Sequence, residues 1–189
     1  LVWFRRDLRD YDHAALSHAL QESNQVFCIF IFDKEILNAL KNKEDRRVEF
    51  IWESVKELKE SLIEKKSDLI VTYDLASNAI SRVIDEFKIE AIYTNRDYEP
   101  YALLRDKALY DMLQSMGVGF SGAKDHVIFE KNEVMKGDGT PYTVFTPYSR
   151  KWKEPKVQSK CIEVCKGKGC QGCGHCYHYP TVQPCATQK

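Results

Sequence analysis

The chain has 189 residues, which is enough for one domain with a substantial hydrophobic core and a short appendage. Lysine plus arginine and aspartate plus glutamate both number 28, so the net charge is zero, which argues against a protein that binds nucleic acid by charge alone. No stretch is long and apolar enough to cross a bilayer and no signal peptide precedes the first predicted strand, so we expect a location in the cytoplasm, or in the nucleus of a eukaryote.

The first stretch of the chain predicts a buried strand that ends in a charged loop. Leu1 to Phe4 is a short apolar run, typical of a strand buried on both faces. The charges then alternate in sign from Arg5 to Asp10, and a helix is predicted from about His13 to Gln21 with Asp12 as its capping residue. Because the sequence starts without Met inside a strand, we expect a fragment at the N-terminus.

Strands and helices alternate over the following hundred residues. Apolar runs predict four further strands at Val26–Phe32, Leu69–Tyr73, Ala91–Thr94 and Val118–Phe120. Apolar residues at helical spacing predict three more helices: a long one with Val48, Ile51, Trp52, Val55, Leu58 and Leu62 facing inward, one at Leu75–Phe87 and one from Pro100 to about Met116. Right-handed crossovers then predict an α/β fold with a doubly wound, Rossmann-like parallel sheet of five strands in the order 3-2-1-4-5.

The alternation stops after the fifth predicted strand, which suggests three parts. We expect the α/β domain at residues 1–121 and, at residues 122–156, an irregular extension that lies over the sheet and leads to a linker. Turn residues at 136–139 and an aromatic, proline-punctuated run indicate this irregular chain. Residues 157–189 are a cysteine-rich tail, predicted to be disordered or non-native.

The distribution of glycine excludes two common kinds of nucleotide site. No glycine occurs before Gly117. Both the GxGxxG dinucleotide motif and the GxxxxGK[ST] phosphate loop need glycines directly after a strand. A ligand of this sheet is therefore not held by a glycine-rich phosphate loop.

Cysteine is concentrated in the tail. Cys28 lies in the apolar run VFCIFIF and is predicted to be a core residue, whereas six cysteines lie between 161 and 185. Cys170, Cys173 and Cys176, with His175, have a spacing that suits zinc or an iron–sulfur cluster. A fourth ligand does not fall at a familiar offset, so a disordered tail and a stretch foreign to the protein remain as alternatives.

Charged residues follow the first, second and fourth predicted strands: Arg5, Arg6, Asp7, Asp33, Asp97 and Glu99. In a doubly wound sheet the ligand lies beyond the carboxyl ends of the strands, so these side chains are candidates for binding. With Phe4, Phe32 and Tyr98 nearby they suit a polar, planar ring, while spacing alone favours the alternative of a self-neutralising salt-bridge cluster. No arrangement of nucleophile and base stands out, which predicts a binding domain without catalytic groups.

Five segments occur in the order VWFRRDLRDYDHAAL, FDKEIL, RRVEFI, NRDYEPYALLRD and GTPYTVFTPYSRKW, within residues 1–152. Together they resemble the N-terminal α/β domain of the DNA photolyase/cryptochrome family, which carries an antenna chromophore near the carboxyl edge of its sheet. The resemblance implies that Phe32, Asp33, Arg47, Asp97 and Glu99 surround a flavin or deazaflavin antenna, with Arg5, Arg6 and Asp7 beside it. Folate is disfavoured, because folate-binding members have Asn-Glu where this chain has Tyr101-Ala102.

The resemblance also implies a role in a larger protein. The antenna of a photolyase absorbs light and passes the excitation to reduced FAD, which donates an electron to a pyrimidine dimer and splits it. A helical domain of the same parent chain would hold that FAD and contact the DNA, so we expect the present chain alone to be inactive, with no membrane partner. A fragment of a cryptochrome photoreceptor and a nucleotide-binding module with a zinc-binding tail are the alternatives.

Overall fold

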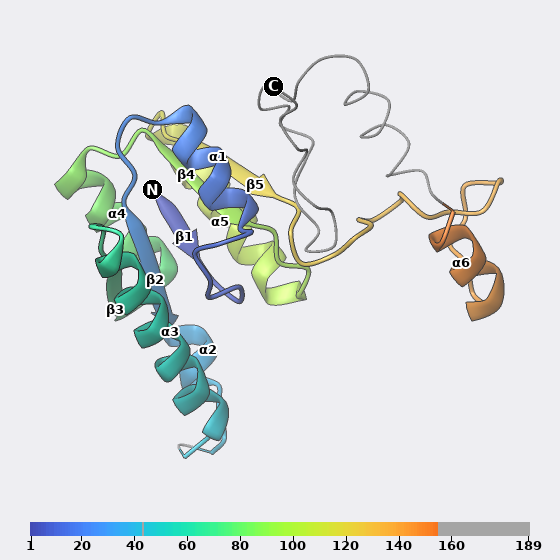
Figure 1. The fold of residues 1–189 in the computed structure, drawn as a ribbon, viewed down its shortest axis with the longest axis horizontal. Helices are drawn as coiled ribbons and strands as arrows, with labels where there is room; N and C mark the ends of the chain where they lie inside the picture. Colours follow the sequence, from blue (N-terminus) through green and yellow to red (C-terminus); the bar gives the residue numbers. More distant parts are fainter. Residues whose placement is uncertain (43, 155–189) are drawn as a thin grey trace, which may run out of the picture. The chain divides into compact units, whose positions relative to one another are not determined.

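The computed structural model describes residues 1–42 and 44–154, and the α/β part of the chain is built on a parallel five-stranded sheet (Figure 1). The strands are β1 (Val2–Phe4), β2 (Cys28–Asp33), β3 (Ile70–Asp74), β4 (Ala91–Asn95) and β5 (Gly119–Ala123). Their order in the sheet is β3-β2-β1-β4-β5, which confirms the predicted doubly wound topology.

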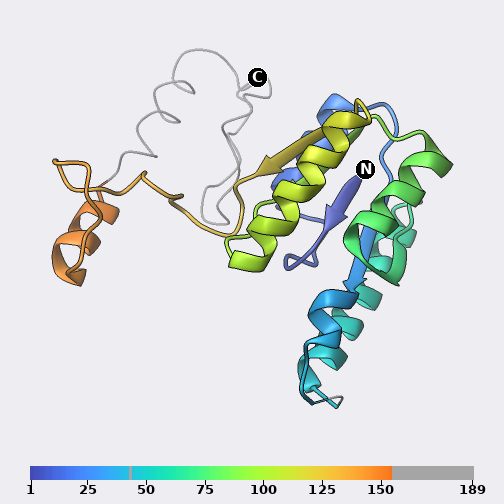
Figure 2. The same ribbon diagram turned by 180° about the vertical axis from the view of Figure 1, so that it is seen from behind.

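Helices cover both faces of the sheet. One face carries α1 (Ala14–Glu22) and α3 (Arg46–Glu64), whose apolar residues share a core cluster with Val2, Phe4 and Phe30. The other face, seen in Figure 2, carries α4 (Ala76–Phe87) and α5 (Pro100–Ser115), which pack on Trp3, Ile29 and Ile31. The short helix α2 (Lys34–Asn38) follows β2 directly. Because each central strand faces helices on both sides, nearly every residue of β1 and β2 is buried.

The chain changes direction across the sheet between β1 and β4. After β1 it builds outward through β2 to β3, and after β3 it returns to place β4 on the other side of β1. Val2 is therefore register partner of both Cys28 and Tyr93. In such sheets the crevice for a ligand lies at this reversal, beyond the carboxyl ends of the strands.

Two local expectations from the sequence are wrong. The cap of α1 is His13, and not Asp12, which takes a left-handed backbone with φ of 46°. The spacing of Trp52 in α3 predicts a core residue, but 54% of it is exposed, whereas Leu58 on the same helix is 3% exposed.

The chain divides into two compact units, Leu1–His126 and Val127–Lys189. In the described part of the second unit, α6 (Phe145–Trp152) forms where irregular chain was expected. The Trp152 ring of this helix meets the edge of Phe129 at 5.7 Å between ring centroids. The cysteine-rich tail, with Cys170, Cys173, Cys176 and His175, lies outside the described residues. Within the described residues, no helix has the length and apolarity needed to cross a membrane.

Candidate functional site

Arg5, the first residue after β1, is buried and tied to α5. Its Nη1 donates to both carboxylate oxygens of Asp106, at 2.8 and 2.7 Å, and its Nη2 donates to the backbone oxygen of Asn95. Burial lowers the pKa of the guanidinium and the Asp106 carboxylate opposes that shift. Only 6% of the side chain is exposed, so Arg5 is a buried connection that joins β1 to β4 and α5.

Asp33, the last residue of β2, is tied to the same helix. Its Oδ2 accepts from Tyr101 Oη at 2.8 Å and from Arg105 Nη1 at 3.3 Å, and its Oδ1 accepts from the backbone N of Glu35 at the start of α2. Burial and the hydrogen bond to Asp33 raise the pKa of the Tyr101 hydroxyl. The carboxylate is therefore already satisfied by groups of the protein.

Two guanidinium groups lie over the ring of Trp3, which is 2% exposed in β1. Arg105 lies 4.6 Å and Arg5 4.9 Å from the ring centroid. Arg105 also contacts Asp106 at 3.3 Å, which links the Asp33 and Arg5 contacts into one network. Arg105 and Asp106 were not among the residues predicted from the sequence, although Tyr101 and Arg105 stand one helical turn apart, a spacing that marks a shared polar face.

Arg6 and Asp97 form a second, more exposed pair at the reversal of the sheet. Arg6 Nε donates to Asp97 Oδ2 at 2.9 Å, and Arg6 Nη2 lies 3.7 Å from Glu99 Oε1. Burial acts to raise the pKa of Asp97, but the hydrogen bond from the Glu99 backbone N and the charge of Arg6 outweigh it and hold that pKa below its usual value. Arg6 and Glu99 are 56% and 61% exposed, so this pair faces solvent.

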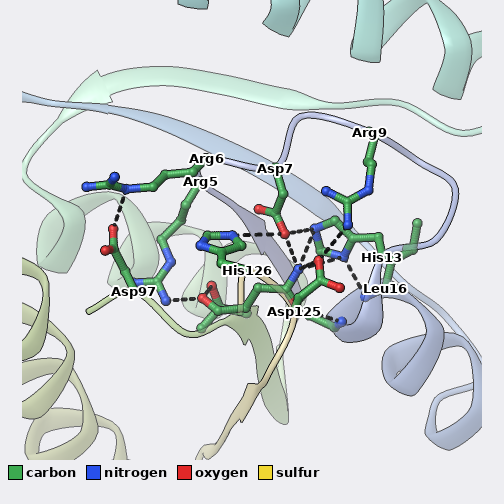
Figure 3. A network of polar contacts seen from close by, with 12 residues as sticks. Arg5, Arg6, Asp7, Arg9, His13, Leu16, Asp97, Asp125 and His126 are labelled. Atoms are coloured by element: carbon green, nitrogen blue, oxygen red, sulfur yellow. Dashed lines mark hydrogen bonds and ion pairs between the residues drawn. The ribbon is translucent and has the colours of Figure 1, made fainter. Parts of the chain in front are cut away.

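Asp7 is the centre of a third, buried cluster (Figure 3). Its Oδ2 accepts from Asn95 Nδ2, and it lies 3.1 Å from His13 Nε2 and 3.4 Å from His126 Nε2. Burial acts to raise the pKa of Asp7, but the contacts with the two histidines and Asn95 hold it well below its usual value. Asp7 is therefore a buried carboxylate in contact with the cap of α1, with β4 and with the chain after β5.

Asn95 and Asp125 complete this cluster. Asn95 Nδ2 also donates to Asp125 Oδ2 at 2.7 Å, and Asn95 Oδ1 accepts from the backbone N of Ala15 in α1. Arg9 Nη2 donates to Asp125 Oδ2 at 2.8 Å. Burial and the neighbouring Asp7 raise the pKa of the Asp125 carboxyl group. The loop after β1 is thus joined to both β4 and the end of β5.

Phe32 and Arg47 lie apart from these charge clusters. Phe32 is half-buried and packs with the core on the α3 face, opposite to the face where its neighbour Asp33 meets α5. Arg47 in the first turn of α3 has a side chain that is 78% exposed. Its guanidinium pairs with Asp45, the residue that caps the same helix, at 2.5 Å.

The predicted binding residues thus fall into several groups. The structure brings Arg6, Asp97 and Glu99 together, links Arg5 to Asp33 through α5, and places Asp7 in the buried cluster. These pairings agree with the salt-bridge alternative, and a role for the same residues in binding a ligand stays a prediction. Among the described residues, no cluster of three or more histidine, cysteine or acidic side chains has the arrangement of a metal site.

Comparison with known proteins shows where such a fold occurs. The sequence model of the DNA photolyase family matches residues 1–164. The chain belongs to the DNA photolyase/cryptochrome family. It corresponds to the N-terminal α/β domain of that family, as the resemblance predicted.

The curated relatives of this family domain include both photolyases and cryptochromes. The chain is 30% identical over 166 residues to the deoxyribodipyrimidine photo-lyase of Alkalihalophilus pseudofirmus, covering 85% of this chain and 34% of that protein. It is also 30% identical over 162 residues to cryptochrome-2 of Arabidopsis thaliana, covering 84% of this chain and 26% of that protein. The chain spans about a third of the length of the first of these relatives.

Two solved structures are similar to this photolyase-family domain. A class III photolyase from Agrobacterium tumefaciens superposes with a TM-score of 0.71 at 27% identity, over 79% of this chain and 30% of its own. An archaeal photolyase from Sulfolobus tokodaii superposes with a TM-score of 0.61 at 32% identity, over 69% of this chain and 31% of its own. The archaeal structure is described as containing two FAD molecules, with the implication of a novel light-harvesting cofactor.

Proposed function

We propose that this chain is the antenna domain of a photolyase and binds a flavin or deazaflavin at the carboxyl edge of its sheet. The observation that carries the proposal is the similarity to the archaeal photolyase with two FAD molecules, one more flavin than the catalytic site of a photolyase would hold. The reversal between β1 and β4 supplies a place for such a ligand, since ligands of doubly wound sheets lie there.

The residues at this edge can hold a flavin-type ring without any acid–base chemistry. Asp97 and Glu99 offer carboxylate acceptors for ring or ribityl donors, and Arg6 offers a cation for carbonyl or phosphate oxygens. The bound ring would supply absorption of near-UV or blue light. The domain itself has only to fix the position and orientation of that ring. The buried contacts of Arg5 and Asp33 with α5 make this edge of the sheet rigid.

The residues of α5 support a flavin over a folate. Tyr101, at the first of the two positions where folate-binding members have Asn-Glu, donates its hydroxyl to Asp33. Ala102, at the second position, is 3% exposed and has no polar side-chain group. Neither position offers the amide or carboxylate that a folate would meet there.

Repair of DNA belongs, in this proposal, to a longer parent chain. The chain covers about a third of the Alkalihalophilus photo-lyase, which leaves room for a helical domain that would hold the catalytic FAD and contact the damaged DNA. We expect that parent protein in the cytoplasm, or in the nucleus of a eukaryote. The carbon–carbon lyase reaction would take place in the helical domain.

A cryptochrome fragment is the second candidate function, because cryptochrome-2 matches this chain with the same identity as the first photolyase. Repair of a thymine-dimer oligonucleotide by the parent protein under blue light, with a dark control, separates the two. Light-dependent repair supports a photolyase. A parent protein that binds its chromophores and leaves both this dimer and a (6-4) photoproduct intact supports a cryptochrome.

The binding of the antenna is tested directly on this chain. Equilibrium dialysis with FMN, FAD, a deazaflavin and a folate should show saturable binding of a flavin or deazaflavin and weaker binding of the folate. Asp97→Ala and Arg47→Ala should each weaken that binding about tenfold, because a charge-assisted contact is removed. Arg82→Ala is the control, since Arg82 is an exposed helical arginine that pairs with Asp74 at the β3 edge. If no flavin binds, or if all three variants match the unmodified chain, the site is assigned wrongly.

A further inference from the structure

Trp52 is an aromatic residue that the core of the protein does not use. It lies in α3 on the face that carries Val55 and Leu58, yet 54% of it is exposed. Its ring instead lies on Phe32, with 5.9 Å between the centroids and 34° between the planes. Phe32 is the penultimate residue of β2, so the contact sits at the carboxyl end of the sheet.

Trp52 lies near the N-terminal end of α3, at the margin of its apolar face. With 19 residues α3 is about 28 Å long, whereas the six residues of β2 span about 20 Å. The N-terminal turns of α3 therefore extend past the strand that they pack on, as Figure 1 shows. Ile51 packs against the core, whereas the neighbouring Trp52 lies at the margin of the buried face of α3 and contacts Phe32.

Phe32 gives Trp52 a firm support. The Phe32 ring meets the edge of Phe30 at 4.9 Å, and Phe30 is buried in the core. On the other side, Phe32 is register partner of Tyr73 in β3, which is 52% exposed and lies under the ammonium group of Lys34 at 5.4 Å. Trp52, Phe32 and Tyr73 form an aromatic strip at the carboxyl ends of β2 and β3.

The charged groups at the same edge are already paired, and this limits the binding free energy that a ligand can gain from them. The carboxylate of Asp33 is satisfied by Tyr101 and Arg105, and Asp97 is paired with Arg6. A ligand that displaces these contacts gains less binding free energy from them than from unpaired groups, because each new hydrogen bond replaces an existing one. An exposed indole face that becomes covered by a planar ring adds both buried apolar area and a stacking contact.

We propose that Trp52 is the residue that stacks on the planar ring of the chromophore, a flavin or deazaflavin. The proposal rests on the proposed antenna function and adds to it a residue outside the set expected to bind. In this proposal the aromatic strip supplies the stacking contact for the ring.

The test uses the full chain with two aromatic ligands, riboflavin and FMN, in equilibrium dialysis and in visible circular dichroism of the bound ring. Trp52→Ala should weaken binding of both ligands about tenfold or more, the range seen when an aromatic residue that stacks on a base is removed. The loss should be equal for both, because they share the ring and differ in the phosphate. Trp52→Phe should restore most of the affinity.

Phe50→Ala is the matched control. Phe50 is 73% exposed on the same helix, and it lies two positions before Trp52, which turns it to the opposite side of α3. The Phe50→Ala variant should bind both ligands with the affinity of the unmodified chain. The induced circular dichroism of the ring should change only in the Trp52 variants.

The outcomes separate this inference from the function on which it rests. If the unmodified chain binds neither riboflavin nor FMN, the antenna proposal itself fails. If it binds them and Trp52→Ala binds equally well, the antenna proposal stands and the stacking role of Trp52 is overturned. The stacking role is also overturned if Trp52→Ala and Phe50→Ala weaken binding to the same extent, since exposed aromatic area in general would then be responsible.

Discussion

At the scale of single residues, His13 joins two parts of the fold with its two ring nitrogens. Nδ1 accepts a hydrogen bond from the backbone N of Leu16 at 3.1 Å and so caps α1. The ring is therefore protonated on Nε2, the atom that lies 3.1 Å from Asp7 Oδ2. One imidazole ring thus both caps the helix and contacts a buried carboxylate.

Replacing His13 separates these two contributions. His13→Ala removes the cap and one partner of Asp7, so we expect a loss of about 2–3 kcal/mol in the free energy of unfolding. His13→Asn should lose clearly less, because an asparagine oxygen can cap the helix while its amide donates to Asp7. Denaturant unfolding of the three proteins measures this. Equal losses in both variants would contradict the capping role.

The pair of carboxyl groups next to His13 should make stability depend on pH in two opposite ways. The pKa of Asp7 is lowered on folding, so its contribution to stability is present above its unfolded value of about 3.9 and is lost as the pH falls below it. The pKa of Asp125 is raised on folding, so the folded protein holds its proton longer, and its contribution is lost as the pH rises through that raised value.

Two amide variants isolate these effects. Asp7→Asn should destabilise the protein more at pH 7 than at pH 3, because the contribution of the ionised Asp7 begins to be lost once the pH falls below its unfolded pKa of about 3.9. Asp125→Asn should be best tolerated at pH 7, where it removes a carboxylate placed next to Asp7. Melting temperatures from pH 3 to pH 8, compared with the unmodified chain, give both slopes. Parallel curves for all three proteins would show that these groups do not titrate differently on folding.

At the scale of the elements, α3 shows that apolar spacing alone does not establish that a residue is buried. Leu58 and Trp52 share the helical spacing of core residues, but they are 3% and 54% exposed. We expect Leu58→Ala to cost about 2–5 kcal/mol, the range for a buried leucine, and Trp52→Ala to cost clearly less. Thermal or denaturant unfolding checks the ranking. A larger loss for Trp52→Ala would mean that its ring belongs to the core.

Apolar patterning was sufficient to predict every strand of the sheet, its order and the four helices that cover it. Spacing along one element, however, does not indicate how wide a strip of that element its neighbours cover, and this explains the wrong placement of Trp52, which lies at the margin of the buried face of α3. The helix α6 was missed because it has only eight residues and includes a proline, although Phe145, Tyr148 and Trp152 recur at helical spacing.

The candidate site was predictable only in part, for a related reason. Strand ends can be found from the sequence, and they indicated Arg5, Asp33 and Asp97. Their partners Arg105 and Asp106 lie on α5, about seventy to a hundred residues away from Asp33 and Arg5, and only the packing of that helix brings them in. His126 and Asp125 follow the short strand β5, whose end was predicted three residues early.

At the scale of the whole molecule, the end of the α/β unit can be located by experiment. Sequence patterning places it at residue 121, whereas the compact unit runs to His126. The five additional residues include Gly122 and Ala123, register partners of Thr94 and Asn95, and also Asp125 and His126 of the buried cluster. Both core clusters lie within residues 1–123.

We therefore expect a fragment of residues 1–126 to fold cooperatively and a fragment of residues 1–121 to melt at least about 5 °C lower, the shift that a loss of 1–2 kcal/mol gives in a domain of this size. The shorter fragment lacks the backbone acceptor of Ala123 for Arg96 N and leaves Asp7 and Asn95 each without a partner in the cluster. A fragment of residues 1–144, which ends before α6, is the control and should melt like residues 1–126. If residues 1–121 and 1–126 melt together, the cluster around Asp7 contributes nothing to the stability of the sheet.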